Sequence, residues 1–165
     1  MSSDIDLFSI TPGVGVSGLQ LGTPPEVVEQ RIGEPPAKFQ EEVPEGGDVE
    51  LWEYPDLGLY LSFGSDFGGL MDSIRLQRPD TTLFGEPVAG LKRDQLIRLM
   101  AAHGYAPSME ESHTIDGNRL LSIEYDDLSL LFWLDSKSRV GAVQVGLFWT
   151  DDEVPLFPDP DWLDS

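Results

Sequence analysis

A glycine-rich segment near the start of the chain is the first candidate for chemistry. Gly13 to Gly18 reads Gly-Val-Gly-Val-Ser-Gly, which matches the GxGxxG spacing of loops that hold a dinucleotide pyrophosphate at a helix N-terminus. The helix expected here starts only near Pro24, with Leu19 to Gly22 in between, and no parallel-sheet pattern follows. We therefore expect a glycine-rich lead into a strand and no bound cofactor.

The chain has only two histidines, His103 and His113, and no cysteine. A zinc site would need both histidines to converge with carboxylates, and no HExxH-like spacing is present. His103 lies at the expected C-terminal end of a helix, and the attraction of a cation to the helix dipole there is enough to explain it. Without cysteine there is no thiolate nucleophile, and no serine lies in a GxSxG segment. The sequence therefore predicts neither a metal centre nor a nucleophilic active site.

Pairs of adjacent acids are the remaining candidates for catalysis. They are Glu41-Glu42, Glu110-Glu111, Asp126-Asp127 and Asp151-Asp152. Acid–base catalysis by carboxyl groups needs two of them several ångströms apart across a cleft, with one pKa raised by burial. Adjacent acids in polar turns are usually solvated and ionised. We therefore expect that the protein is not an enzyme.

The charge balance limits the possible partners. The 165-residue chain carries 30 Asp and Glu against 10 Lys and Arg, a formal charge of −20 at pH 7. Phosphate backbones and anionic lipids repel such a surface, so we expect neither nucleic-acid nor membrane binding. The stretch from Glu41 to Asp56 holds seven acids and no Lys or Arg, and its field would attract a basic protein. Without cysteine, a signal-peptide pattern or an apolar run of about 18 residues, a cytoplasmic protein is expected.

Two segments of the chain align with each other. Glu53 to Leu61 and Glu124 to Phe132 are identical at five of nine positions, which indicates an internal repeat. Upstream of each segment an amphipathic stretch predicts a helix. Thr23 is expected to cap the first of these helices with Pro24 at its first position, and Gly33 is expected to end it.

Three strands are expected after each helix. The predicted fold class is therefore α+β, with two tandem helix-plus-three-strand repeats, residues 13–79 and 82–149, that form a joined antiparallel sheet with the helices on one face. Residues 1–150 would form a single domain and residues 151–165 an acidic, proline-containing tail. The expected strands are 49–54, 58–63 and 70–77 in the first repeat and 119–126, 128–134 and 140–149 in the second.

The alternation along these strands sorts their side chains onto two faces. The helix-covered face would hold Trp52, Tyr54, Leu59, Leu61, Phe63, Ile74, Leu76, Ile123, Tyr125, Leu128, Leu130, Phe132, Leu134, Val143 and Val145. The opposite face would show Glu53, Tyr60, Ser62, Arg75, Glu124, Leu131, Trp133, Gln144 and Phe148. Exposed aromatic residues surrounded by acids suit a basic partner protein. In the alternative interpretation, Tyr60 and Trp133 simply cover each other or the tail.

The tail combines charge with apolar residues. Residues 150–165 contain six acids and no base, yet they also include Val154, Leu156, Phe157, Trp162 and Leu163. A purely solvating tail would not need these apolar side chains. We expect the tail to dock partly on the domain or to become ordered against a partner.

The repeat plan resembles the tandem architecture of the β-lactamase inhibitor protein family, and each half is similar to the small helix-on-sheet units of the BamE/SmpA type. The resemblance rests on Gly18 to Thr23 with Val27 and Val28, then on Trp52 to Tyr54 and Leu59 to Phe63. It implies an open sheet face that grips a target enzyme. That inhibitor is secreted and disulfide-bonded, so a chain without cysteine departs from it and a β-lactamase target is not expected. By type, a small acidic chain is also similar to the immunity proteins of bacterial toxin systems.

The sequence therefore predicts a non-enzymatic protein-binding module, an inhibitor or immunity protein. It would occlude a basic target, a toxin or an enzyme, and would bind no cofactor or metal. The predicted partner-binding residues are Glu53, Tyr60, Ser62, Glu124, Leu131, Trp133 and Phe148. Two alternatives stay open. The first is a small enzyme or ligand-binding domain with a pocket between the repeats, and the second is a subunit of a larger assembly that docks through its tail.

Overall fold

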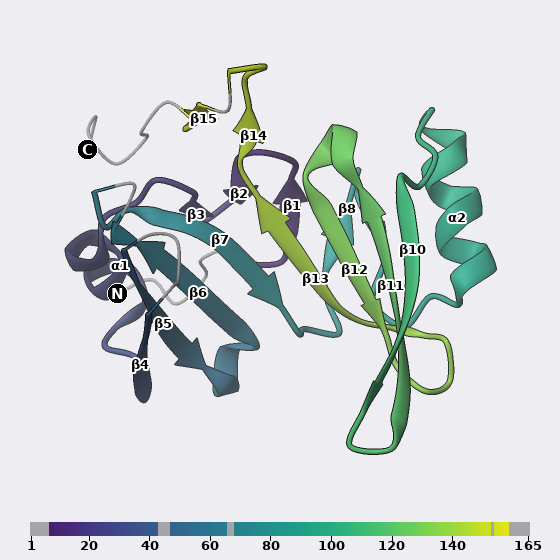
Figure 1. Cartoon of the computed structure of the whole chain (residues 1–165), viewed down its shortest axis with the longest axis horizontal. Helices are drawn as coiled ribbons and strands as arrows, with labels where there is room; N and C mark the ends of the chain where they lie inside the picture. Colours follow the sequence, from purple (N-terminus) through teal and green to yellow (C-terminus); the bar gives the residue numbers. More distant parts are fainter. Residues whose placement is uncertain (1–6, 43–46, 66–67, 153, 159–165) are drawn as a thin grey trace.

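The computed structural model describes residues 7–42, 47–65, 68–152 and 154–158. Its main feature is an antiparallel sheet of eight strands in the order β10-β11-β12-β13-β7-β6-β5-β4. Each half of the sheet is a run of four consecutive strands, and β13 pairs with β7 at the junction (Figure 1). The strands are β4 (Ala37–Glu42), β5 (Asp48–Tyr54), β6 (Leu59–Gly64), β7 (Met71–Leu76), β10 (Met109–Ile115), β11 (Asn118–Tyr125), β12 (Leu130–Leu134) and β13 (Val140–Gly146).

A smaller sheet, in the order β3-β2-β1-β8-β9, joins the start of the chain to the segment between the two halves. Its strands β1 and β8 run parallel. The glycine-rich segment leads into this sheet, as the sequence predicted, because Gly15–Val16 and Leu19–Gln20 form a short hairpin. The short strands are β1 (Ser9–Thr11), β2 (Gly15–Val16), β3 (Leu19–Gln20), β8 (Thr82–Leu83) and β9 (Glu86–Pro87), and a C-terminal hairpin adds β14 (Phe148–Trp149) and β15 (Pro155–Leu156).

Two α-helices, α1 (Pro25–Ile32) and α2 (Arg93–Ala102), occur in the described part of the chain. The predicted cap of the first helix is wrong, because Pro24 occupies the N-cap position. The Thr23 hydroxyl instead donates to the carbonyl oxygen of Gln20 at 2.7 Å. No helix of the described residues is long and apolar enough to span a bilayer.

The helices and the smaller sheet pack on one face of the large sheet. Val28 of α1 and Leu96 and Met100 of α2 belong to the same hydrophobic core as the inward-facing strand residues. Every strand residue that the alternation assigned to the covered face is buried, from Trp52 to Val145. The assignment of the two faces from sequence is therefore confirmed for the core side.

The predicted fold class is wrong. The chain is mostly strand, with an eight-stranded antiparallel sheet and only two α-helices among the described residues, and four strands follow each helix in that sheet instead of three. The additional strands are β4 and β10 at the two edges of the sheet. The two helix-plus-three-strand repeats are thus replaced by a β-rich fold. The resemblance to the β-lactamase inhibitor family and to BamE/SmpA-type units is corrected with it, since it rested on the helix-plus-three-strand plan.

Candidate binding surface

A row of half-buried side chains crosses the open face of the large sheet. Tyr60 of β6 lies opposite Arg75 of β7, and Arg75 lies opposite Gln144 of β13 across the junction between the halves. Because directly opposed residues point to the same face of an antiparallel sheet, these side chains form one continuous surface. We call it the central row. In order across the sheet it consists of Glu53, Tyr60, Arg75, Gln144, Leu131 and Glu124.

The structure places six of the seven predicted binding residues on this face of the large sheet, and the seventh, Phe148, lies outside that sheet. Four of them belong to the central row: Glu53, Tyr60, Leu131 and Glu124. Ser62 lies two residues further along β6, and Trp133 lies two residues beyond Leu131 along β12. Phe148 lies on β14, where its ring packs so closely on Gly13 that there is no room for a Cβ atom there.

Tyr60 and Trp133 do not cover each other. The guanidinium of Arg75 lies over the Tyr60 ring, 4.7 Å from its centroid. The ring centroid of Trp133 is 5.2 Å from that of His113, which reaches over from the edge strand β10. Each aromatic ring is therefore supported by a different neighbour and keeps part of its surface accessible.

A groove of about 740 Å³ opens beside the central row, between the open face and the C-terminal hairpin. Four carboxylates line it: Asp72 of β7, Glu124 of β11, and Asp126 and Asp127 of the turn that follows β11. Leu131, Phe148 and Trp149 supply its apolar wall, and its described lining includes no Lys, Arg or His. Figure 1 shows β14 beside the turn that joins β11 to β12, which brings these residues together from distant parts of the sequence. We call this feature the acidic groove.

The acids of the groove are not compensated by neighbouring cations. Burial raises the pKa of Asp72, and a hydrogen bond from the Ser62 hydroxyl only partly offsets that effect. The pKa of Glu124 is raised mainly by its hydrogen bond with the Asp126 carboxyl, together with desolvation and the negative charges of Asp126 and Glu111. Burial and neighbouring acids cause these two shifts, and no cation lines the described part of the groove. A cation bound in the groove would therefore be favoured.

The hairpin beside the groove carries exposed apolar side chains. Trp149, Val154 and Leu156 are each about half exposed, at 50%, 52% and 49%. The hairpin is fixed to the body by Phe157, which packs on the core and closely against Gly22. Of the two alternatives expected for the tail, the packing of Phe157 fits docking on the domain, whereas Trp162 and Leu163 lie outside the described residues.

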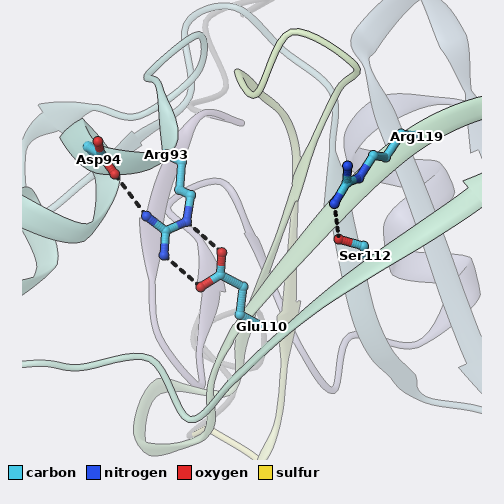
Figure 2. A network of polar contacts seen from close by, with 5 residues as sticks. All are labelled: Arg93, Asp94, Glu110, Ser112 and Arg119. Carbon is cyan, nitrogen blue, oxygen red and sulfur yellow. Dashed lines mark hydrogen bonds and ion pairs between the residues drawn. The ribbon is translucent and has the colours of Figure 1, made fainter.

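The far edge of the sheet shows the opposite electrostatic arrangement. Arg93 of α2 forms a two-pronged ion pair with Glu110 of β10 and a further contact with Asp94 at 2.8 Å, as Figure 2 shows. This arginine lowers the pKa of Glu110 through hydrogen bonding. On the same edge Arg119 donates to the hydroxyl of Ser112 at 3.3 Å. Acidic side chains at this edge are thus paired with an arginine, whereas the carboxylates of the acidic groove have no cation among its described lining residues.

A serine and a histidine approach each other on the open face. The Oγ of Ser122 is 2.9 Å from the Nε2 of His113, a distance typical of a nucleophile and its base. Ser122 is only 8% exposed, however, and the nearest carboxylate, Glu111, approaches the same nitrogen at 4.0 Å. A catalytic arrangement needs an accessible hydroxyl and a carboxylate at the other ring nitrogen. The pair lacks both of these features. The described residues also contain no cluster of three His, Asp or Glu side chains suited to a metal ion.

Sequence reasoning missed three of the four carboxylates that line the groove. The sequence predicts Asp126 and Asp127 to be solvated turn acids, although they follow Glu124 by only two and three positions along the chain. Asp72 gave no local signal, because it reaches the groove only when β7 and β13 pair at the centre of the sheet.

No protein-family model matches the chain, and a search of curated proteins finds no relative. A search of solved structures finds the crystal structure of an extracellular protein containing an SCP domain from Bacillus anthracis strain Ames. The sequence identity is 15% and the TM-score 0.44, and the match covers 85% of this chain and 49% of that chain. The chain thus spans about half the length of that protein. That protein is described as extracellular, and the cytoplasmic location expected from this sequence stays a prediction.

Proposed function

We propose that the chain is a non-enzymatic protein-binding module that binds and occludes a basic target protein. The observation that carries the proposal is the acidic groove, in which four carboxylates converge beside apolar side chains without a lining cation. A lysine or arginine of the target would enter the groove and form charge-assisted hydrogen bonds with these carboxylates. Such bonds are each worth about 1.5–3 kcal/mol when partly shielded from water.

The surroundings of the groove supply the apolar part of the contact. Phe148 and Trp149 form one wall, and Leu131 joins the groove to the central row. Aromatic anchors next to charged pockets are typical of the residues that carry most of the binding energy at protein interfaces. The net charge of −20 adds a long-range attraction that would raise the association rate with a basic partner.

The proposal is tested with a probe of defined charge. The peptide Ac-Arg-Leu-Arg-Leu-Arg-NH2 is titrated into the protein by isothermal calorimetry, with a matched peptide in which citrulline replaces arginine. Citrulline keeps the shape of arginine and removes its charge. We expect the arginine peptide to bind at least tenfold more tightly, with an affinity that falls as salt is added, because added ions screen the attraction.

The position of the site is tested by removing groove charges. The double variant Asp126→Asn with Asp127→Asn should weaken binding of the arginine peptide about tenfold, since both acids line the groove. The matched control is Asp116→Asn, the same chemical change in the distant turn between β10 and β11, which should alter affinity less than twofold. The control removes one charge and the groove variant removes two. If Asp116→Asn costs half as much binding free energy as the double variant does, the peptide responds to the total charge of the protein and the groove is not the site.

The pH dependence gives a second test of the same site. Asp72 and Glu124 have raised pKa values, so they become protonated at a higher pH than ordinary carboxyl groups do. Affinity for the arginine peptide should therefore fall as the pH is lowered through these raised values. Affinity that stays constant over that range would contradict a role for these two carboxylates.

A further inference from the structure

Arg75 stands out in the central row because it is the only cation there. It lies at the centre of the large sheet, on β7, with Tyr60 on one side and Gln144 on the other. The other charged groups of the central row are the carboxylates Glu53 and Glu124 at its two ends. An isolated positive charge is thus placed between two negative ones on a face that is otherwise acidic.

The guanidinium of Arg75 makes no hydrogen bond or ion pair with the described residues. Its Nε atom is buried and has no acceptor, which is a costly state for a charged donor. Its contact with protein is the Tyr60 ring, which lies 4.7 Å below the guanidinium carbon. A guanidinium over an aromatic face is attracted by the ring without using its N–H donors in hydrogen bonds to that ring, so the donors stay available to an acceptor.

A hollow of about 310 Å³ lies at this position. Tyr60, Ser62 and Ser73 line it together with Arg75 and Gln144, so hydroxyl and amide groups surround the guanidinium. A carboxylate is the ligand that fits such a site, because its two oxygens match the parallel N–H groups of arginine and further donors can complete the contact. Glu53 also lines the hollow and would repel a free anion. The carboxylate must therefore arrive on a segment whose other charges are positive.

We propose that Arg75 binds an acidic side chain of the target, which lies between two basic residues of the same segment. This inference rests on the proposed function and specifies the chemistry of the target surface. Neighbouring strands lie about 4.8 Å apart, so Arg75 is about 10 Å from the Glu53 position and about 14 Å from that of Glu124. An extended chain advances about 3.3 Å per residue and its side chains alternate between two faces, so residues that point to the same surface are separated by an even number of positions. A separation of four positions spans about 13 Å, which brings a long basic side chain within reach of either glutamate. The matching segment has the pattern basic, three spacers, acidic, three spacers, basic.

Two peptides test the inference directly. The first is Ac-Arg-Ser-Ser-Ser-Glu-Ser-Ser-Ser-Arg-NH2, and the second replaces its glutamate by glutamine. Binding is measured by two-dimensional NMR, which follows the Nε–H signal of Arg75 together with backbone signals across the sheet. We expect the glutamate peptide to bind about tenfold more tightly, although its net charge is less favourable for an acidic protein, and to shift the Arg75 Nε–H signal.

Variants separate a specific contact from a general charge effect. In Arg75→Gln the preference for the glutamate peptide should disappear, and in Arg75→Lys it should fall below threefold, because an ammonium group lacks the planar pair of donors. The control is Arg98→Gln, which removes an exposed positive charge from α2 and should leave the preference unchanged. Circular dichroism spectra that match the wild type establish that the variants are folded.

The outcomes distinguish this inference from the proposed function. If both peptides bind wild type and Arg75→Gln with equal affinity, basic docking stands and the acid-reading role of Arg75 is overturned. If the glutamine peptide binds more tightly than the glutamate peptide, Arg75 only balances the nearby acids and the inference also falls. Failure of both peptides to bind would overturn the inference together with this form of the proposed function.

Discussion

The two halves of the large sheet contain turns with the same backbone conformation but with different charged side chains around them. In the first half β5 passes to β6 through the turn Pro55–Leu57, and in the second half β11 passes to β12 through Asp126–Leu128. Each turn ends at a residue in the left-handed region, Gly58 with φ 63° and Ser129 with φ 51°. The backbone requirement is therefore the same in both places.

The side chains around the two turns differ. Arg78 lies beside the first turn, where it donates to the carbonyl of Leu57 at 2.8 Å and pairs with Asp80 at 2.9 Å. The second turn carries Asp126 and Asp127, faces the acidic groove and has no base among the described lining residues of that groove. The two turns have the same backbone conformation, although the charged side chains around them differ. This indicates that folding does not need the excess of acids at the second turn. That excess is what the proposed binding of a basic target uses.

Two tryptophans provide the largest test of this difference between the halves. Trp52 is buried in the first half and its ring centroid lies 4.7 Å from that of Phe63, whereas Trp133 lies on the open face of the second half. Trp52→Ala should lower the free energy of unfolding by about 3–5 kcal/mol, the usual cost of emptying a large core position. Trp133→Ala should lower it by about 1 kcal/mol or less and should instead weaken binding of the target by about 2 kcal/mol.

Urea unfolding of both tryptophan variants, followed by circular dichroism, measures the first quantity. Equal losses of stability would mean that Trp133 is a core residue and that the open face serves the fold. Wild-type affinity of Trp133→Ala for a purified target, in a folded variant, would remove Trp133 from the binding surface.

Exchanging the residues that end the turns tests whether the two backbones are equivalent. Gly58→Ala should lower stability by about 1–3 kcal/mol, because its φ is positive and a Cβ atom would lie 2.7 Å from the backbone oxygen of Gln77. Ser129→Gly should change stability by less than about 1 kcal/mol, since relief of the same strain is offset by loss of the 2.7 Å hydrogen bond from Ser129 to the carbonyl of Leu147. Thermal denaturation of both variants decides the point. A large gain for Ser129→Gly would show that the second turn stores more strain than the first.

The alternation of apolar residues predicted the inner strands well. The expected strand at 49–54 is observed as Asp48–Tyr54, and the one at 119–126 as Asn118–Tyr125. The edge strands β4 and β10 were missed because almost all their residues are exposed, so neither carries an apolar face. Their sequences read Ala-Lys-Phe-Gln-Glu-Glu and Met-Glu-Glu-Ser-His-Thr-Ile, and charged residues are typical of edges protected against further pairing.

The central row could be predicted from sequence, and the acidic groove could not. Glu53, Tyr60 and Glu124 follow from period two alone, because their neighbours along each strand are apolar and buried. The groove needs β7, β13 and β14 in contact with the turn after β11, a set of distances that no local pattern contains. The short strands β1 to β3 are similarly invisible, since two or three residues are too few to show a period.

Removing the cation beside the first turn sharpens the comparison of charges. Arg78→Gln should lower the free energy of unfolding by about 1 kcal/mol, because both the bond to the Leu57 carbonyl and the pair with Asp80 are lost. Arg98→Gln, on an exposed part of α2, is the matched change of charge and should have a smaller effect. If the two variants lose the same stability in urea, the first turn does not depend on its arginine. The two turns would then differ in their residues, but not in how much a charged side chain stabilises them.

The smallest effect concerns Asp72, and its sign follows from the pKa. Burial raises the pKa of Asp72 in the folded state, so the fold favours the protonated carboxyl and loses stability as the pH rises through the interval from the unfolded to the folded value. Asp72→Asn should therefore raise stability at neutral pH, by about 0.5 kcal/mol, and leave it unchanged below the unfolded pKa.

Glu110 provides the opposite case, because Arg93 lowers its pKa. Its contribution to stability is present above the unfolded pKa and is lost as the pH falls through the lowered value, so Glu110→Gln should lower stability at neutral pH. Urea midpoints of both variants are measured as a function of pH, with Asp116→Asn as the control for total charge. Each of the three changes removes one negative charge. If local partners decide the sign of the effect, Asp72→Asn raises stability at neutral pH and Glu110→Gln lowers it. Identical pH profiles for Asp72→Asn and Asp116→Asn would show that Asp72 feels only the overall charge of the chain, and Asp72 would then not count among the unmatched acids that a target neutralises.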